Sequence, residues 1–484
     1  MCENRPRETQ VGCEPARRPR RGVAAALAML YLVLFSTLAI GFYAAFTLAT
    51  QVSYNERASR RALSTAESGM EFVRYQLWAL DIEHNTLPDE LFDKVYAQLS
   101  AAMNGTENLK GGNIARVGDT ILIPGDPEEF IELNDQGDAF RVTIRRDGKE
   151  LIVSAVGRAD AGNASVAQLD RAIRLRYGIF EKPSAIFDFG VASKSRIEMI
   201  GNTQILGSPD PAAGSVLSTA SDAYPLVMGS NCAISGEVSF SNPGAWVQSG
   251  KNSVINNEVG EANWSDNVHH VGEPDFPVVD TSDYAIYATN TIASKNPMGT
   301  QFVNIRIPAN TNPTFAAGTE IYGVIYIEGP NHVKFAGHSA IHGIIVAENN
   351  AAGSWDSGNV IEFRGTVDAD GVENLPENDP RFAGLRELGG AFILAENFSV
   401  DFGGTASVGA TGIAGSIVAS SVSFTGTADA VVEGSIINLE PTSSVYFKGS
   451  SGVTIKSTGT KTQPHGLYFG SRYVPLPGSY EEVQ

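Results

Sequence analysis

The sequence has little cysteine and little charge, and it has no charged residue across its longest apolar run. Its 484 residues include three cysteines, Cys2, Cys13 and Cys232. They are too few and too widely spaced for a disulfide framework or a four-ligand zinc site. Charged residues make up only 18% of the chain, whereas glycine occurs 50 times. This composition favours a turn-rich β architecture over a helical one.

Positive charge is scarce outside the N-terminus. The net charge is −19, although residues 1–61 contain nine arginines and only four glutamates. The rest of the chain is therefore strongly acidic and would repel nucleic acid phosphates. The sequence predicts no nucleic acid partner.

The longest apolar run lies near the N-terminus. No charged residue occurs between Gly22 and Asn55. As a helix, residues 22–50 would be about 44 Å long, which exceeds the ~30 Å hydrocarbon layer of a membrane. The run is also longer than the ~7–15 apolar residues of a cleavable secretory signal. We predict a basic cytoplasmic leader at 1–21 and a retained transmembrane helix at 22–50. The predicted location is the cell (inner) membrane, with a single pass and a large periplasmic or extracellular C-terminal part.

The helix is predicted to continue beyond the membrane over residues 51–80. The chain has no proline between Pro19 and Pro88. Apolar residues recur in this segment at steps of three and four, which places them on one helix face. They are Ala62, Ala66, Met70, Val73 and Leu77. We expect this stripe to pack on a folded domain.

Two short motifs flank the apolar run. Arg20, Arg21 and Gly22 precede it, and "STAESGMEF" follows at Ser64–Phe72. This arrangement resembles the PilX-like proteins of type IV pilus assembly. The resemblance implies pilin-like subunits or an assembly platform as partners, together with the membrane, and a prepilin peptidase site between Gly22 and Val23. Leu27 departs from the pattern, because major pilins carry glutamate there.

The resemblance also implies that the motif of Ala66, Glu67, Ser68 and Gly69 packs on its own domain. Glu67 has two interpretations, a solvated carboxylate on the helix surface or a contact to the following sheet. Residues 81–182 are predicted to form that small α+β domain. They contain a helix near Pro88–Met103 and a hairpin signal at Asp147–Gly148.

Short repeats appear from residue 183 onward. "IYGVIY" at 321–326 returns as "IHGIIV" at 341–346, and "IAGSIV" at 413–418 returns as "VEGSII" at 432–437. A Phe-x-Gly series interleaves with these repeats, beginning at Phe335, Phe363, Phe402, Phe424 and Phe447. Such self-similarity without helical periodicity is typical of a solenoid. We interpret the distance from Phe335 to Phe402 as about three coils.

The predicted fold class is therefore mainly β. A transmembrane pilin-like helix and a small α+β head precede a parallel β-helix at 183–457, in which glycine forms the corners. Inserted loops are expected near 262–313 and 351–391, and a C-terminal tail at 458–484. The phrase "SAIFDFGVASKSRIEMIGNTQILG" at 184–207 also resembles the start of the ectodomain in planctomycete-type PilX-like proteins.

Candidate ligand residues are few. Adjacent residues of a strand point to opposite faces, which argues against joint chelation by His269 and His270. The histidines at 332, 338 and 342 lack cysteine or dense acidic neighbours, and Asp368 with Asp370 forms only an incomplete calcium loop. We interpret this acidic stretch as a flexible turn. The sequence predicts no catalytic residue, no metal and no cofactor.

These features predict a non-enzymatic structural or assembly protein. It would be a minor pilin-like or pseudopilin-like component of a type IV pilus or a type II secretion-like system. One alternative is a membrane-tethered β-helix protein that binds, or less readily cleaves, surface polysaccharide. Another is an anchored protein that has the pilin architecture without its assembly pathway.

Overall fold

The chain divides into two compact units. The computed structural model describes residues 21–483, except 84–85, 136, 160–168, 183, 350–357, 404–407 and 457–462. Most of the predicted leader, residues 1–20, therefore lies outside the described residues. Unit 1 comprises Met1–Leu80, Leu87–Ile179 and Tyr473–Gln484, and unit 2 comprises Asp81–Thr86 and Phe180–Arg472.

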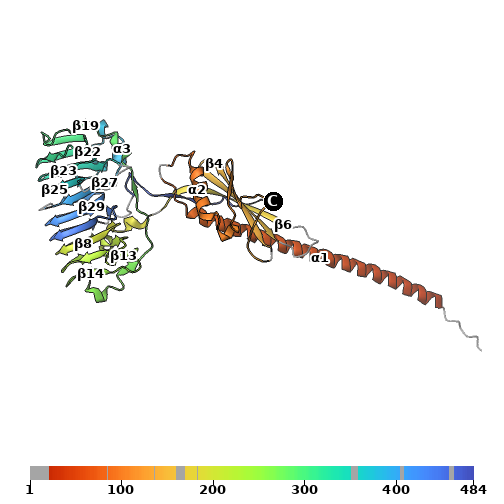
Figure 1. Ribbon diagram of the computed structural model, residues 1–484. Helices are drawn as coiled ribbons and strands as arrows, with labels where there is room; N and C mark the ends of the chain where they lie inside the picture. The colour runs from red at the N-terminus through yellow and green to blue at the C-terminus, as the bar shows by residue number, and fades with distance from the viewer. Residues whose placement is uncertain are drawn as a thin grey trace, which may run out of the picture. The chain divides into compact units, whose positions relative to one another are not determined.

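The first element is one uninterrupted helix, α1 (Arg21–Trp78), shown in red and orange in Figure 1. It has 58 residues and contains no proline, so its backbone ladder continues from the apolar run into the predicted extension. This result confirms the predicted long apolar helix at the N-terminus. The large side chains of the first half are exposed in the structure, from Val23 to Tyr54.

The second half of α1 packs on the antiparallel sheet of unit 1. The strand order is β1-β2-β4-β5-β6-β35, with β3 paired to β4 and β36 paired to β6. The strands are β1 (Ala115–Val117), β2 (Thr120–Ile123), β3 (Ile131–Glu132), β4 (Ala139–Asp147), β5 (Glu150–Ala159), β6 (Leu169–Glu181), β35 (Ser471–Pro475) and β36 (Glu481–Val483). The hairpin predicted at Asp147–Gly148 joins β4 to β5.

The core of unit 1 lies between this sheet and its two helices. The apolar stripe of α1 is at most 4% exposed and faces β4 and β5. The second helix, α2 (Leu91–Met103), buries five side chains spaced along one face, namely Leu91, Phe92, Val95, Leu99 and Met103. The end of the chain returns to the same sheet, where β36 pairs antiparallel with β6.

Unit 2 consists mainly of short strands that pair in parallel in one 26-stranded sheet. We call this sheet the strand stack. Its strands form three series, and most turns of the chain contribute one strand to each series.

The strands of each series follow in their spatial order. The first series is β19 (Asn290–Thr291), β20 (Gln301–Ile307), β22 (Thr319–Ile327), β24 (Ser339–Ala347), β27 (Ala391–Phe402), β29 (Ser416–Gly426), β31 (Ile436–Asn438), β7 (Val191–Ser193), β10 (Val216–Ser218), β13 (Val238–Phe240) and β17 (Val268–His270). The second is β21 (Thr314–Phe315), β23 (His332–Phe335), β25 (Val360–Phe363), the later parts of β27 and β29, β32 (Ser444–Gly449), β8 (Arg196–Gly201), β11 (Leu226–Met228) and β14 (Val247–Ser249). The third is the early parts of β20, β22 and β24, then β26 (Val367–Asp370), β28 (Val408–Ala414), β30 (Asp429–Glu433), β33 (Gly452–Lys456), β9 (Gln204–Ser208), β12 (Ala233–Ile234) and β15 (Val254–Ile255).

Three further strands pair antiparallel in unit 2. They are β16 (Glu258–Val259), which pairs with β15, and β18 (Val278–Val279), which pairs with β34 (Leu467–Tyr468). A single-turn helix, α3 (Ser282–Ala285), follows β18.

The repeats found in the sequence are strands in register. Ile321 pairs with Ile341, and Ile417 pairs with Ile436. The phenylalanines form a row of nearly parallel rings with centroids 4.9–5.3 Å apart, from Phe315 through Phe335, Phe363, Phe402 and Phe424 to Phe447. Phe335 reaches Phe402 in two steps through Phe363. The expectation of three coils was therefore wrong, because these two coils carry longer insertions.

Strands do not stack in the order of the chain. The strands β31, β32 and β33, near the end of unit 2, pair with β7, β8 and β9, near its start. From β7 the chain proceeds to β17 at one end of the strand stack. Residues 271–289 then lead to β19 at the opposite end. Figure 1 labels β19 at one end of the strand stack and β14 at the other.

A buried polar network lies where the first and last strands meet. The side-chain amide of Asn438 donates to the hydroxyl oxygens of Ser193, at 3.1 Å, and Ser195, at 2.7 Å. All three residues are at most 1% exposed. Since an unpaired buried amide is costly, these bonds favour this register over alternatives.

Glycine and asparagine form the bends between series. Gly323 pairs with Gly343 where β22 and β24 turn, and both have positive φ. A Cβ atom at Gly343 would collide with the carbonyl oxygen of Gly323. Asn304 occupies the corresponding bend of β20 with a φ of 46°. Asparagine tolerates this left-handed conformation better than most residues, so the bends do not depend on glycine alone.

A second apolar core covers the outer side of the first series. The outward side chains of Val324, Val346 and Leu394 are fully buried. Two inserted segments cover them, one around α3 and one containing three short 3-10 helices, η5 (Val372–Asn374), η6 (Pro380–Phe382) and η7 (Leu385–Glu387). This explains the continuous apolar runs in the repeats, because strands buried on both faces lose the alternating pattern.

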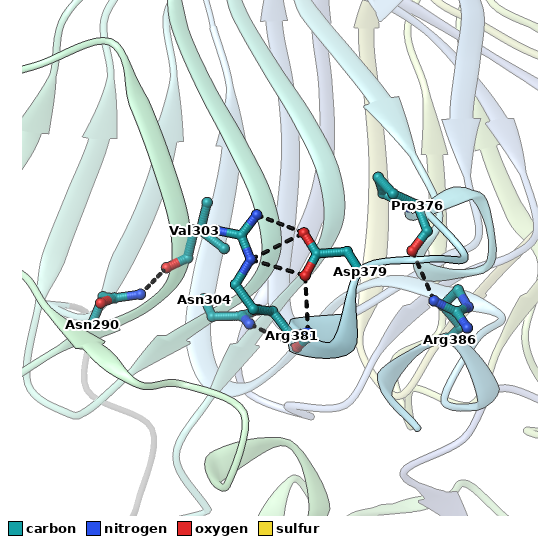
Figure 2. Close-up of polar contacts among 7 residues, drawn as sticks. All are labelled: Asn290, Val303, Asn304, Pro376, Asp379, Arg381 and Arg386. Atoms are coloured by element: carbon teal, nitrogen blue, oxygen red, sulfur yellow. Dashed lines mark hydrogen bonds and ion pairs between the residues drawn. The ribbon is translucent and has the colours of Figure 1, made fainter. Parts of the chain in front are cut away.

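Polar contacts fasten the second insertion to the strand stack. The Asn304 side chain donates to the Arg381 carbonyl at 3.1 Å (Figure 2). Within the insertion, Arg381 pairs with Asp379, and Arg386 donates to the Pro376 carbonyl at 2.8 Å (Figure 2). Residues 371–390, part of the insertion predicted near 351–391, thus cover the strand stack, whereas β25 and β26 in the same range are strands of the stack itself.

Replacing Phe447 by alanine is expected to destabilise unit 2 by about 3–5 kcal/mol, because it removes a fully buried ring from the row. Tyr446 is the matched control, since it lies on the same strand but is 38% exposed. Its alanine variant should change stability by less than about 1 kcal/mol. Urea unfolding of the full chain, monitored by pulse proteolysis, measures both effects. Equal losses would show that the row contributes no special stability.

Candidate functional site

The Ala-Glu-Ser-Gly motif lies where α1 crosses the sheet of unit 1. Ala66 is fully buried and Gly69 is also buried, whereas Glu67 is exposed. The Ser68 hydroxyl donates to the Ser64 carbonyl within the helix at 3.0 Å. Burial raises the pKa of Tyr480 in the C-terminal segment, and the negative charge of Glu67 adds to this shift. The motif therefore combines a buried small-residue face with a solvated carboxylate.

Close approach between helix and sheet explains the small residues. A Cβ atom at Gly69 would lie only 2.6 Å from Cδ2 of Phe140 on β4. On the opposite side, a Cβ atom at Gly157 on β5 would collide with the backbone of Ala62 and Ala66. Glycine on both elements allows the backbones to approach more closely than other residues permit.

An ion pair on the same helix fixes its contact with β4. The Arg61 guanidinium donates to both carboxylate oxygens of Asp138 at 2.8 Å, and the Asn134 amide donates to Oδ2 at 2.9 Å. Burial alone would raise the pKa of Asp138. The hydrogen bonds and the charge of Arg61 outweigh this effect and lower it. Asp138 therefore stays ionised at the edge of the contact between α1 and the sheet.

The possible processing site lies at the start of the apolar half. Gly22 is in the first turn of α1, and Val23 is 59% exposed. Leu27 is likewise exposed. The helix is long and apolar enough to cross a membrane, and none of the apolar window is buried inside the protein. The hydrocarbon of a membrane would cover the exposed side chains, including Leu30, Phe35 and Phe42.

Histidines of unit 2 pair with acidic residues along the strand stack. Nδ1 of His342 lies 3.0 Å from Oδ2 of Asp370, and Nε2 of His338 lies 3.7 Å from Oδ2 of Asp368. Both aspartates belong to β26, so the expected flexible acidic turn is an ordered strand. The ring of His342 stacks on Tyr322 with centroids 4.6 Å apart. The structure thus brings the histidines 338 and 342 close to Asp368 and Asp370, which the sequence analysis treated separately.

The other histidines have separate neighbours. Nε2 of His269 lies 3.1 Å from Glu237, whereas Nε2 of His270 lies 3.0 Å from the Ala245 carbonyl oxygen. His332 lies 3.2 Å from Glu362. Burial would raise the pKa of Glu362, but its contacts with Arg364 and Lys334 lower it. Within the described part of the chain, no group of three or more His, Cys, Asp or Glu residues could hold a metal ion.

Sequence reasoning missed Gly157, Arg61 and Asp138. Gly157 interrupts the apolar alternation of β5, which is a signal for close backbone approach within a strand. Arg61 and Asp138 are 77 positions apart, and no local pattern links them. Only the packing of the helix on the sheet brings these three residues together.

Comparisons with known proteins gave structural likeness only at a low TM-score. No protein-family model matches the chain, and no curated protein matches it. Among solved structures, the competence-associated pilin ComZ from Thermus thermophilus aligns with a TM-score of 0.26 at 11% identity. That alignment covers 88% of this chain and 97% of ComZ.

Replacing Gly157 by alanine is expected to destabilise unit 1 by about 1–3 kcal/mol, because the added methyl group forces α1 away from β5. Gly41→Ala is the matched control, since nothing lies within 4 Å of its Cβ position. Urea unfolding of the full chain in detergent measures both variants. A Gly157 variant as stable as the Gly41 variant would contradict the close-packing argument.

Replacing Asp138 by asparagine is expected to cost unit 1 about 1–3 kcal/mol at neutral pH, because the charged acceptor for Arg61 is lost. The folded-state pKa of Asp138 is below its unfolded value of about 3.9. Its contribution is therefore complete above the unfolded value and disappears as the pH falls through the folded value. Unfolding measured across acidic and neutral pH should show the variant and the wild type converging in acid.

The exposed pair Arg74–Glu71 provides a control for this pH dependence. Glu71→Gln should cost less than about 1 kcal/mol at every pH. A constant difference between Asp138→Asn and the wild type across the pH range would exclude the proposed ionic contribution.

Proposed function

We propose that this protein is a pilin-like membrane component with a structural rather than catalytic role. The observation that carries the proposal is the division of α1 into two halves. Large apolar side chains are exposed from Val23 to Tyr54, whereas the stripe from Ala62 to Leu77 is buried on the head sheet. One helix thus serves both as an anchor for a membrane and as the spine of a folded head.

The motifs around the helix support a PilX-like role within this class. The Ala-Glu-Ser-Gly motif lies at the contact between helix and sheet, where its small residues are needed. Leu27 provides no carboxylate to pair with the amino terminus of a neighbouring subunit. We therefore propose a minor component of a type IV pilus or a type II secretion-like system, which binds pilin-like subunits or an assembly platform.

Unit 2 is proposed to be a parallel β-helix carried outside the cell membrane. The parallel pairing in three series and the phenylalanine row support this interpretation. The N-terminus would face the cytoplasm, following the arginines before the apolar run. Presentation of a rigid surface outside the membrane requires no catalytic group.

The native N-terminus tests the proposal. Mass spectrometry of protein from the membrane fraction should find Val23 as the first residue, with the preceding leader removed. Gly22→Trp should retain the leader, because the residue before the cleaved bond is changed, whereas Gly41→Ala should be processed like the wild type. An intact leader on the wild-type protein would overturn assignment to a pilus or secretion pathway that uses a prepilin peptidase.

A further inference from the structure

A cavity in unit 1 is not accounted for by the proposed function. It has a volume of about 890 Å³ and is lined by α1, the segment after α2, the β3 region, β4 and β5. Ser68 and Phe72 form its α1 wall, directly beside the buried Ala66 and Gly69. Ser68 of the Ala-Glu-Ser-Gly motif therefore lines a cavity that lies between α1, the sheet and the β3 region.

The cavity combines apolar surface with an acidic rim. Phe72 and Phe140 contribute apolar walls, with ring centroids 5.7 Å apart. Its lining contains four glutamates and two cations, Lys110 and Arg158. Lys110 pairs with Glu132 at 2.9 Å, and Arg158 pairs with Asp170 outside the lining at 2.9 Å.

Negative charge therefore remains on the rim. Among the described residues, neither Glu107 nor Glu129 has an ion-pair partner, and both are exposed. An uncompensated carboxylate beside an apolar wall favours a ligand that places a cation next to an apolar group. This charge argument favours lysine or arginine beside a large apolar side chain.

An unpaired strand edge lies in the same cavity wall. The strand β3 pairs with β4 and with no other described strand. The Leu133 amide donates to the Asp138 carbonyl at 2.8 Å, on the β4 side. Peptide groups alternate in direction along an antiparallel ladder, so the amide and carbonyl of Glu132 face the opposite side. Such an edge can accept an extended chain as an additional strand.

We propose that this groove binds an extended segment of a partner protein by strand addition along β3. The segment carries an aromatic or large aliphatic side chain flanked by lysine or arginine. Its backbone pairs with Glu132, its apolar side chain contacts Phe72, which lies over the buried Phe140, and its cations face Glu107 and Glu129. The inference extends beyond membrane anchoring and does not depend on leader processing.

The test uses a fluorescein-labelled peptide, acetyl-Gly-Lys-Trp-Lys-Gly-amide, and the full chain in neutral lipid nanodiscs. Fluorescence anisotropy should show saturable binding with a dissociation constant below about 1 mM. The anisotropy measured with empty nanodiscs is subtracted. The Glu107→Gln, Glu129→Gln double variant should bind about fivefold more weakly, because two exposed charge contacts are removed. The matched control is Glu90→Gln with Glu482→Gln, two exposed glutamates of unit 1 outside the cavity.

Two further peptides separate strand addition from simple charge attraction. N-methylation of the tryptophan amide removes a backbone donor but keeps every side chain, and it should weaken binding severalfold. Replacement of both lysines by glutamate should abolish binding. The proposal is overturned if the lysine peptide does not bind, if both double variants bind it equally, or if the N-methylated peptide binds as tightly as its parent.

Discussion

In-register stacking of like side chains is the constraint on which most of this chain depends. Each strand of the strand stack must place its buried residue directly over that of its neighbour. The row from Phe315 to Phe447 shows this most clearly, with rings separated by about one strand spacing. Bends must also align, so Gly343 lies over Gly323 and excludes any side chain there. Extra residues are tolerated where they leave the rows in place, as within β27, where the register shifts between Ala395 and Ser399 but the pairs on either side stay aligned.

Close packing that excludes side chains at particular positions also determines the structure of unit 1. There the constraint is the approach of a helix to a sheet, and Gly69 and Gly157 permit it from opposite sides. The ion pair between Arg61 and Asp138 then fixes the helix against β4 at the edge of the contact. In both units, positions without side chains determine where the larger side chains can pack.

Local patterns in the sequence were sufficient to predict the long helix, the hairpin at Asp147–Gly148 and the repeating strands. These features depend on periodicity, on turn chemistry and on residues close together in the chain. Pairings between distant strands could not be predicted in this way. Nothing local indicates that Val191 pairs with Ile436, because both are ordinary buried residues in short strands.

The candidate site shows the same limit. The small-residue motif was recognisable from the sequence, but its partner Gly157 was not. Gly157 lies on β5, which is separated from α1 along the chain by α2 and the first four strands. Asp368 and Asp370 resembled a loop because acidic residues and glycine are common in turns. Their neighbours Ala340 and His342 instead place them in a strand. The covering role of residues 371–390 became visible only from the outer core.

The order of strands has a consequence for synthesis on the ribosome. The chain is made from β7 toward β33, yet β7, β8 and β9 need β31, β32 and β33 to complete their pairing. A hydrogen bond from the Ser435 hydroxyl to the Phe189 carbonyl spans 246 positions. The earliest strands therefore emerge with one unpaired edge, which stays unpaired until most of unit 2 has been translated. Folding in chain order therefore leaves one edge of β7, β8 and β9 unpaired, and an open edge of this kind can pair with other chains until the later strands cover it.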